Sequence, residues 1–368
     1  MLDSFLISSD IQRKWIEKFK TIEDTFKQRA AKEDIDSKFP FDNIKWLVEE
    51  GYSVLTLPKS YGGEGATIED MVVLQSYLGA IDGATALSIG WHLSVVGQLY
   101  QQHMWSQTML DQFAKEVKNG ALVNRAVSEA DTGSPTRGGR PATHAIKTKD
   151  GYKLNGVKTF TSMSKALTHY IVAAFVEDIQ EVGFFLIPRE SKGLEIADNW
   201  NMLGMRATES HDLVLNDVIV PFENFVETKH KPQPNGWILH IPSVYLGIAQ
   251  AARDYAIEFA KTHSPNSIEG TIATLPTVQQ NVGKMESLLL SARHFLWSTA
   301  RGYNQYNETL NIWNETSASK ILVMNQGLEV VDLAMRIVGA KSLEMDRPLQ
   351  RYYRNICLLY TSPSPRDS

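Results

Sequence analysis

The sequence predicts an α+β protein with an α-helical domain, a β domain and a helical bundle, in that order. Residues 1–120 carry apolar side chains at helical spacing and show no strand-like alternation. Alternating polar and apolar residues with turn signals follow over residues 121–228, and helical spacing returns over 236–356. This order predicts three domains within one chain.

Helical spacing defines the elements expected at both ends of the chain. Asp10 is placed to cap the first helix, and the apolar stretch near residues 84–100 predicts a buried core helix. Further helices are predicted over residues 41–50 and 68–78, after Pro242, after Pro276 and from about Ser317. Long helices joined by short loops are typical of an antiparallel bundle.

Turn signals and alternation define the middle domain. Asp150-Gly151 is a strong hairpin turn signal between two short strand-like runs. Strands are predicted over residues 121–128, 145–148, 152–154, 170–176, 182–187 and 211–220. Pro221, which cannot continue an interior strand, is expected to end the last of them.

Composition excludes several classes of protein. The chain has 368 residues, a net charge of −5 and one cysteine, which excludes an internal disulfide framework and a Cys-rich metal site. The acidic balance argues against a nucleic-acid-binding surface. No apolar run approaches the roughly 18–20 residues that span a bilayer, and no signal peptide is apparent, so we expect no membrane insertion and a cytoplasmic location.

The last segment of the chain resembles a cloning artefact. Residues 357–367 read CLLYTSPSPRD, which is similar to the translation of a transposase sequencing adapter. Such scars are excluded from fold predictions, so residues 357–368 are set apart and the native sequence is expected to differ after Ile356. The only cysteine, Cys357, lies in this segment.

Two polar segments of the β domain are candidates for ligand binding. Residues 128–134 combine hydroxyls and glycine after a predicted strand, which suits phosphate or a flat heterocycle, although an ordinary polar loop explains the same residues. Phe160, between Thr159 and Thr161, could pack on a ring, although a strand Phe is usually core. The Gly62–Gly65 loop does not follow a strand, so we interpret it as a turn and not as a dinucleotide motif. No paired-His metal motif, nucleophile elbow or P-loop occurs.

Taken together, these segments resemble the acyl-CoA dehydrogenase flavoprotein superfamily. Six segments carry the resemblance in order: 58–65 (PKSYGGEG), 127–134 (VSEADTGS), 155–162 (NGVKTFTS), 203–208 (LGMRAT), 218–221 (VIVP) and 351–354 (RYYR). The resemblance implies the three-domain fold, a homo-oligomer (tetramer or dimer) and a flavin, FAD or alternatively FMN, between β domain and bundle.

The resemblance also assigns residues to the ligands. The residues assigned to the flavin are Val127, Ser128, Gly133, Ser134, Phe160, Thr161, Ser162, Arg336 and Gly339. Ser134 and Arg206 are assigned to the substrate, whereas Glu129 matches a structural position of the motif. The implied reaction is α,β-dehydrogenation of an acyl-CoA thioester, with hydride passing to flavin N5 and electrons then passing to an electron-transfer flavoprotein.

Two departures from the family pattern keep a second function open. The usual catalytic carboxylate is expected about nine residues after Arg354, within the artefact-like segment, so the base cannot be identified. The alternative position near Trp237 has no carboxylate. The Lys158–Ser162 segment is similar to that of flavin monooxygenases of the desulfurising type, which share the fold and use reduced FMN and oxygen. A non-catalytic relative is a third interpretation.

Overall fold

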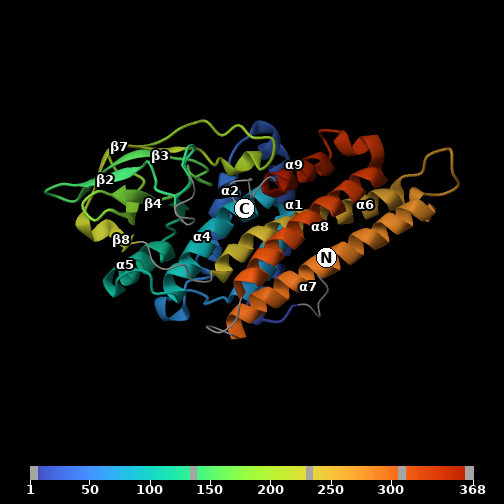
Figure 1. The fold of residues 1–368 in the computed structure, drawn as a ribbon. Helices are drawn as coiled ribbons and strands as arrows, with labels where there is room; N and C mark the ends of the chain where they lie inside the picture. The colour runs from blue at the N-terminus through green and yellow to red at the C-terminus, as the bar shows by residue number, and fades with distance from the viewer. Residues whose placement is uncertain (1–6, 133–138, 229–234, 306–311, 361–368) are drawn as a thin grey trace.

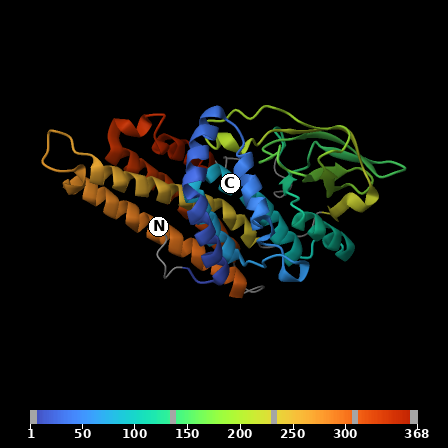
Figure 2. The ribbon, with the colours of Figure 1, turned by 180° about the vertical axis from the view of Figure 1, so that it is seen from behind.

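The computed structural model describes residues 7–132, 139–228, 235–305 and 312–360. Within these ranges the chain forms an elongated molecule with the β domain at one end (Figure 1). The first helices lie between the β domain and the C-terminal helices, as the view from behind also shows (Figure 2). The predicted α, β, α order is therefore confirmed. Across the described ranges, no helix combines the length and apolar character needed to cross a bilayer.

Helices α1 to α5 form the N-terminal domain. Their bounds are α1 Asp10–Asp36, α2 Phe41–Glu49, α3 Ile68–Ile81, α4 Gly83–Gln101 and α5 Gln107–Lys118. The predicted cap of α1 was wrong by one residue, because the Ser9 side chain accepts from the Gln12 N–H and Asp10 is the first helical residue. Helix α4 is buried along nearly its whole length, as its apolar surface predicts.

The middle domain is a single mixed sheet. Its described strands are β1 Val123–Ala126, β2 His144–Lys147, β3 Tyr152–Lys158, β4 His169–Val176, β5 Glu181–Pro188, β6 Leu194–Ile196, β7 Leu213–Val220 and β8 Phe225–Thr228. They follow the order β6-β7-β3-β2-β4-β5-β8, and β1 pairs with β4. The predicted hairpin is confirmed, since Lys147 opposes Tyr152 and Gly151 has a φ of +149°. Strands β6 and β8 were not predicted.

Four long helices form the C-terminal part, at the end of the molecule away from the sheet. They are α6 His240–Thr262, α7 Pro276–Gln305, α8 Ile312–Val338 and α9 Pro348–Tyr360. Figure 1 shows α6, α7 and α8 running side by side, with α9 folded back beside them. Helix α9 continues through Cys357, and Leu358 packs against the core.

Glycines allow the domains to meet backbone to backbone. A Cβ at Gly247 of α6 would lie 2.2 Å from the Ser76 carbonyl oxygen of α3, and a Cβ at Gly79 would lie 2.6 Å from the Val244 carbonyl oxygen. A Cβ at Gly204, in the loop before β7, would lie 1.9 Å from a carbonyl oxygen of α9. These contacts fix the β domain and the N-terminal helices against the bundle.

Candidate functional site

The loop after β1 and the end of β3 lie side by side in the structure. The Thr159 N–H donates to the Ser128 carbonyl oxygen at 2.8 Å, so the two polar segments singled out in the sequence form one surface. Val127 is half-buried and Ser128 is exposed. Gly133 and Ser134 lie outside the described residues.

Glu129 anchors this loop to the sheet. Its carboxylate accepts from Lys158 Nζ at 2.5 Å, from Thr143 Oγ1 at 2.6 Å and from Thr132 Oγ1 at 2.7 Å. Burial alone would raise the pKa of Glu129, but these hydrogen bonds outweigh burial and lower the pKa to about 2. A carboxylate held this firmly in its ionised form serves as an anchor and is a poor proton acceptor, in keeping with the structural interpretation.

The segment after β3 adopts an uncommon backbone shape and pairs with the segment before β7. Phe160 and Met163 have φ values of +57° and +52°, and Met205 and Glu209 have φ values of +51° and +38°. The Met163 N–H donates to the Thr208 carbonyl oxygen at 3.0 Å, which links the two segments. Left-handed backbone at bulky residues is strained and concentrates at functional sites.

Phe160 presents an aromatic ring to the outside of this strained segment. Its side chain is 57% exposed, and its ring meets Trp200 edge to face at 5.9 Å. The Thr159 and Thr161 hydroxyls on either side are buried and have no hydrogen-bond partner within the described residues. An exposed ring between two unpartnered hydroxyls fits a flat ligand with polar edges, as a flavin has.

His211 supports this surface from behind. Its Nδ1 accepts from the backbone N–H groups of Asn199 and Trp200, each at 3.0 Å, so the ring orients Trp200 against Phe160. Burial lowers the pKa of His211, which favours the neutral ring that can accept these bonds. Trp200 and His211 were not predicted from the sequence, because only the fold brings them next to Phe160.

Models of known protein families match all three parts of the chain. The models for the N-terminal, middle and C-terminal domains of acyl-CoA dehydrogenases match residues 12–109, 124–218 and 239–361. The Bacillus subtilis (strain 168) protein YdbM, named only as a candidate acyl-CoA dehydrogenase, is 51% identical over 96% of this chain and 93% of its own. The chain belongs to the acyl-CoA dehydrogenase family. The predicted resemblance is thereby confirmed.

Solved structures of related folds cover more than one chemistry. Butyryl-CoA dehydrogenase from Megasphaera elsdenii has a TM-score of 0.85 at 19% identity, covering 98% of this chain and 96% of that one. FMN-bound TdsC from Paenibacillus sp. A11-2 also has a TM-score of 0.85, at 18% identity, covering 96% and 95%. At these identities the likeness shows the acyl-CoA dehydrogenase fold and leaves the reaction open.

Three further residues are assigned to ligands from the family resemblance. The Arg206 guanidinium donates to the carbonyl oxygens of Asp34 and Ile35 at 2.8 and 3.4 Å and so ties the β domain to α1. Arg336 is exposed near the end of α8, where it pairs with Asp332, and Gly339 is exposed just after that helix. Their ligand contacts stay predictions.

Two histidines are buried between the helices. His92 Nε2 lies 2.9 Å from the Ser53 carbonyl oxygen, and its Nδ1 accepts from the Val123 N–H at 3.1 Å. His240 of α6 meets Trp91 edge to face, and its ring nitrogens have no hydrogen-bond partner within the described residues. Burial lowers the pKa of His92 to about 4 and that of His240 to about 3, so both are neutral at pH 7.

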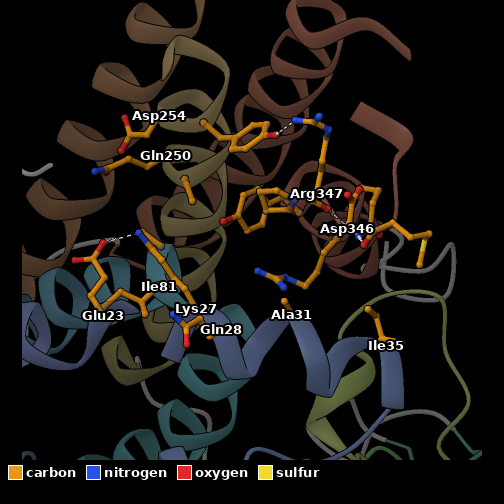
Figure 3. A pocket seen from close by; sticks show the side chains of 18 of the residues that line it. Glu23, Lys27, Gln28, Ala31, Ile35, Ile81, Gln250, Asp254, Asp346 and Arg347 are labelled. Atoms are coloured by element: carbon orange, nitrogen blue, oxygen red, sulfur yellow. Dashed lines mark hydrogen bonds and ion pairs between the residues drawn. The ribbon is translucent and has the colours of Figure 1, made fainter. Parts of the chain in front are cut away.

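A separate cavity of about 650 Å³ lies between α1, α3, α6 and the start of α9 (Figure 3). Its labelled lining residues include Lys27 and Gln28 from α1, Ile81 from α3, and Gln250 and Asp254 from α6. None of its lining residues belongs to the β domain. It is therefore distinct from the surface around Phe160.

Proposed function

We propose that the protein is a flavin-dependent acyl-CoA dehydrogenase. The observation that carries the proposal is the strained end of β3, where exposed Phe160 stands between the unpartnered Thr159 and Thr161 hydroxyls. The acyl-CoA part of the proposal is supported by the YdbM relative, which matches nearly the whole chain. We propose FAD as the flavin, with FMN as the alternative.

The chain's own residues would hold and orient the flavin. Phe160 would cover one face of the ring, while Thr161 and Ser162 would offer hydroxyls to its edge. Val127 and Ser128 would meet the ring through backbone and side chain, and the assignment of Gly133 and Ser134 rests on the family motif. When bound, the flavin supplies the hydride acceptor, and the protein supplies alignment and exclusion of water.

The same proposal also concerns the neighbouring copy, the substrate, the electron acceptor and the catalytic base. Arg336 and Gly339 are exposed, as residues would be that contact the cofactor of a neighbouring copy in a homo-oligomer. An acyl-CoA thioester would be the substrate, contacted by Ser134 and Arg206, and an electron-transfer flavoprotein would take the electrons. The catalytic base is expected about nine residues after Arg354 and has no assigned residue here.

One observation supports a second candidate, a flavin monooxygenase that uses reduced FMN and oxygen. Phe160 and Ser162 stand where family dehydrogenases most often have Trp and Thr, and the FMN-bound TdsC structure shares the fold. We therefore design the test so that the two reactions give different outcomes.

The test first measures flavin binding and then measures reduction of the bound flavin by substrate. We expect the purified protein to bind FAD, to show a flavin absorption spectrum, and to lose that colour without oxygen when butyryl-CoA or a longer acyl-CoA is added. Phe160→Ala should weaken flavin binding about tenfold or more, whereas Phe41→Ala, at a similarly exposed ring in α2, should not. Absence of flavin uptake would refute both candidates. Product formation that requires reduced FMN and oxygen, without acyl-CoA bleaching, would favour the monooxygenase.

A further inference from the structure

Ser162 lies at the end of a chain of three buried hydroxyls. Ser210 Oγ donates to Ser162 Oγ at 2.9 Å, and Thr208 Oγ1 lies 2.9 Å from Ser210 Oγ. The three side chains are 8%, 4% and 1% exposed in the order Ser162, Ser210, Thr208. The chain thus runs from the segment before β7 to the strained end of β3.

The direction of this chain determines where the Ser162 proton can point. A serine hydroxyl has one proton and two acceptor lone pairs. Since Ser210 donates its proton to Ser162, Ser162 cannot donate along the same bond. Within the described residues, the Ser162 hydroxyl has no bonded acceptor of its own, and the Asn124 amide binds only its carbonyl oxygen, at 3.4 Å. Its proton is therefore available to a ligand on the Phe160 surface.

The Thr208 hydroxyl forms the other end of this chain. Its hydroxyl lies 2.9 Å from both the Met205 carbonyl oxygen and Ser210 Oγ. When Thr208 donates to Ser210, the Ser210 hydroxyl keeps its own proton for Ser162, whereas donation from Thr208 to Met205 leaves one Ser210 proton for both of its neighbours. The left-handed turn at Met205 holds this end of the chain in place.

We propose that Ser210 is a positioning residue for the flavin: it orients the Ser162 hydroxyl, and Ser162 occupies the motif position whose hydroxyl bonds near flavin N5 in the family. This inference rests on the proposed flavin function. In the oxidised ring that nitrogen is an acceptor, whereas in the reduced ring it carries a proton. Ser210 should therefore stabilise the oxidised flavin in its site more than the reduced flavin.

The test compares flavin binding in both redox states. Removing the donor by Ser210→Ala should weaken binding of oxidised flavin about three- to tenfold and leave binding of reduced flavin unchanged. By linkage, the midpoint potential of the bound flavin should rise by about 15–30 mV, which is that fold-change for a two-electron couple. Ser210→Thr, which keeps the hydroxyl, should restore the wild-type potential.

A matched control separates positioning from packing. Ser164 is fully buried in the same segment, and its hydroxyl donates to the Glu209 carbonyl oxygen at 2.9 Å. Ser164→Ala should leave the potential unchanged, and Ser210→Ala should have no further effect in a Ser162→Ala background. If Ser210→Ala does not fold, Ser210→Cys, a weaker donor of similar size, should give an intermediate shift.

Two results would overturn the inference in distinguishable ways. Equal weakening of both redox forms, with the potential unchanged, would show that Ser210 only supports packing, while the flavin function stands. Failure of the wild-type protein to bind either redox form would refute the proposed function and this inference with it.

Discussion

Lys158 and Glu129 form a buried ion pair at the root of the loop that follows β1. Lys158 Nζ lies 2.5 Å from Glu129 Oε1, and the two side chains are 0% and 5% exposed. Burial lowers the pKa of Lys158, and the neighbouring carboxylate opposes that shift. The pair fixes the loop relative to Phe160 because Lys158 lies two residues before that ring.

Removing one partner of this pair should be costly. Lys158→Met leaves the Glu129 charge buried without its main partner, so we expect the free energy of unfolding to fall by about 3–5 kcal/mol. Urea denaturation followed by circular dichroism measures the change. Lys153→Met, on the same strand, removes an exposed pair with Asp217 at 3.2 Å and should cost no more than about 1 kcal/mol. Equal losses for the two variants would contradict a buried anchoring role.

The same carboxylate predicts loss of stability in acid. The folded protein lowers the pKa of Glu129 from its ordinary 4.5 to about 2, so the unfolded chain binds a proton first as the pH falls. The stabilisation is present above pH 4.5 and should be lost between pH 4.5 and about 2. Glu129→Gln should be less stable at pH 7 and should lose less stability over that acid range, as thermal melts at successive pH values would show. An unchanged acid profile in the variant would rule out this contribution.

His92 and His240, the two histidines buried between the helices, should respond differently to the same substitution. His92→Phe leaves the Ser53 carbonyl and the Val123 N–H without their partner, so we expect a loss of roughly 1–3 kcal/mol for each group. His240→Phe removes ring nitrogens that have no described hydrogen-bond partner, so its effect should be within about 1 kcal/mol of zero or stabilising. Chemical denaturation of both variants at pH 7 checks the difference. A larger loss for His240→Phe would indicate a polar partner that the described residues do not include.

The order of the domains and most elements could be predicted because long periodic segments leave a clear pattern. Helix α4 and the β2–β3 hairpin were found this way, from an apolar stretch and from the Asp150-Gly151 turn. Strands β6 and β8 were missed because three or four residues carry too little alternation to identify. The Asp10 cap failed since Ser9 also suits that position.

The sequence identifies the candidate residues of the site but not their arrangement. Phe160 and Ser162 could be singled out because ring and hydroxyl chemistry is visible in residue types. The pairing of their segment with residues 205–210 could not, because left-handed backbone at Phe160 and Met205 is not favoured by those residue types. The positions of Ser210 and His211 beside this segment are therefore known only from the fold.

Substitution by alanine should have opposite effects at Gly247 and Gly283, because only Gly247 lies against a neighbouring helix. Gly247→Ala would place a Cβ 2.2 Å from the Ser76 carbonyl oxygen, a clash that only separation of the helices can relieve. We expect it to lower the free energy of unfolding by about 1–3 kcal/mol or more. At Gly283, in the interior of α7, nothing lies within 4 Å of an added Cβ, so Gly283→Ala should stabilise by about 0.5–1 kcal/mol through helix propensity. Denaturant melts of both variants test the pair. Destabilisation at Gly283 would mean that this part of α7 is covered in the protein in solution, and tolerance of alanine at Gly247 would mean that α3 and α6 do not meet backbone to backbone.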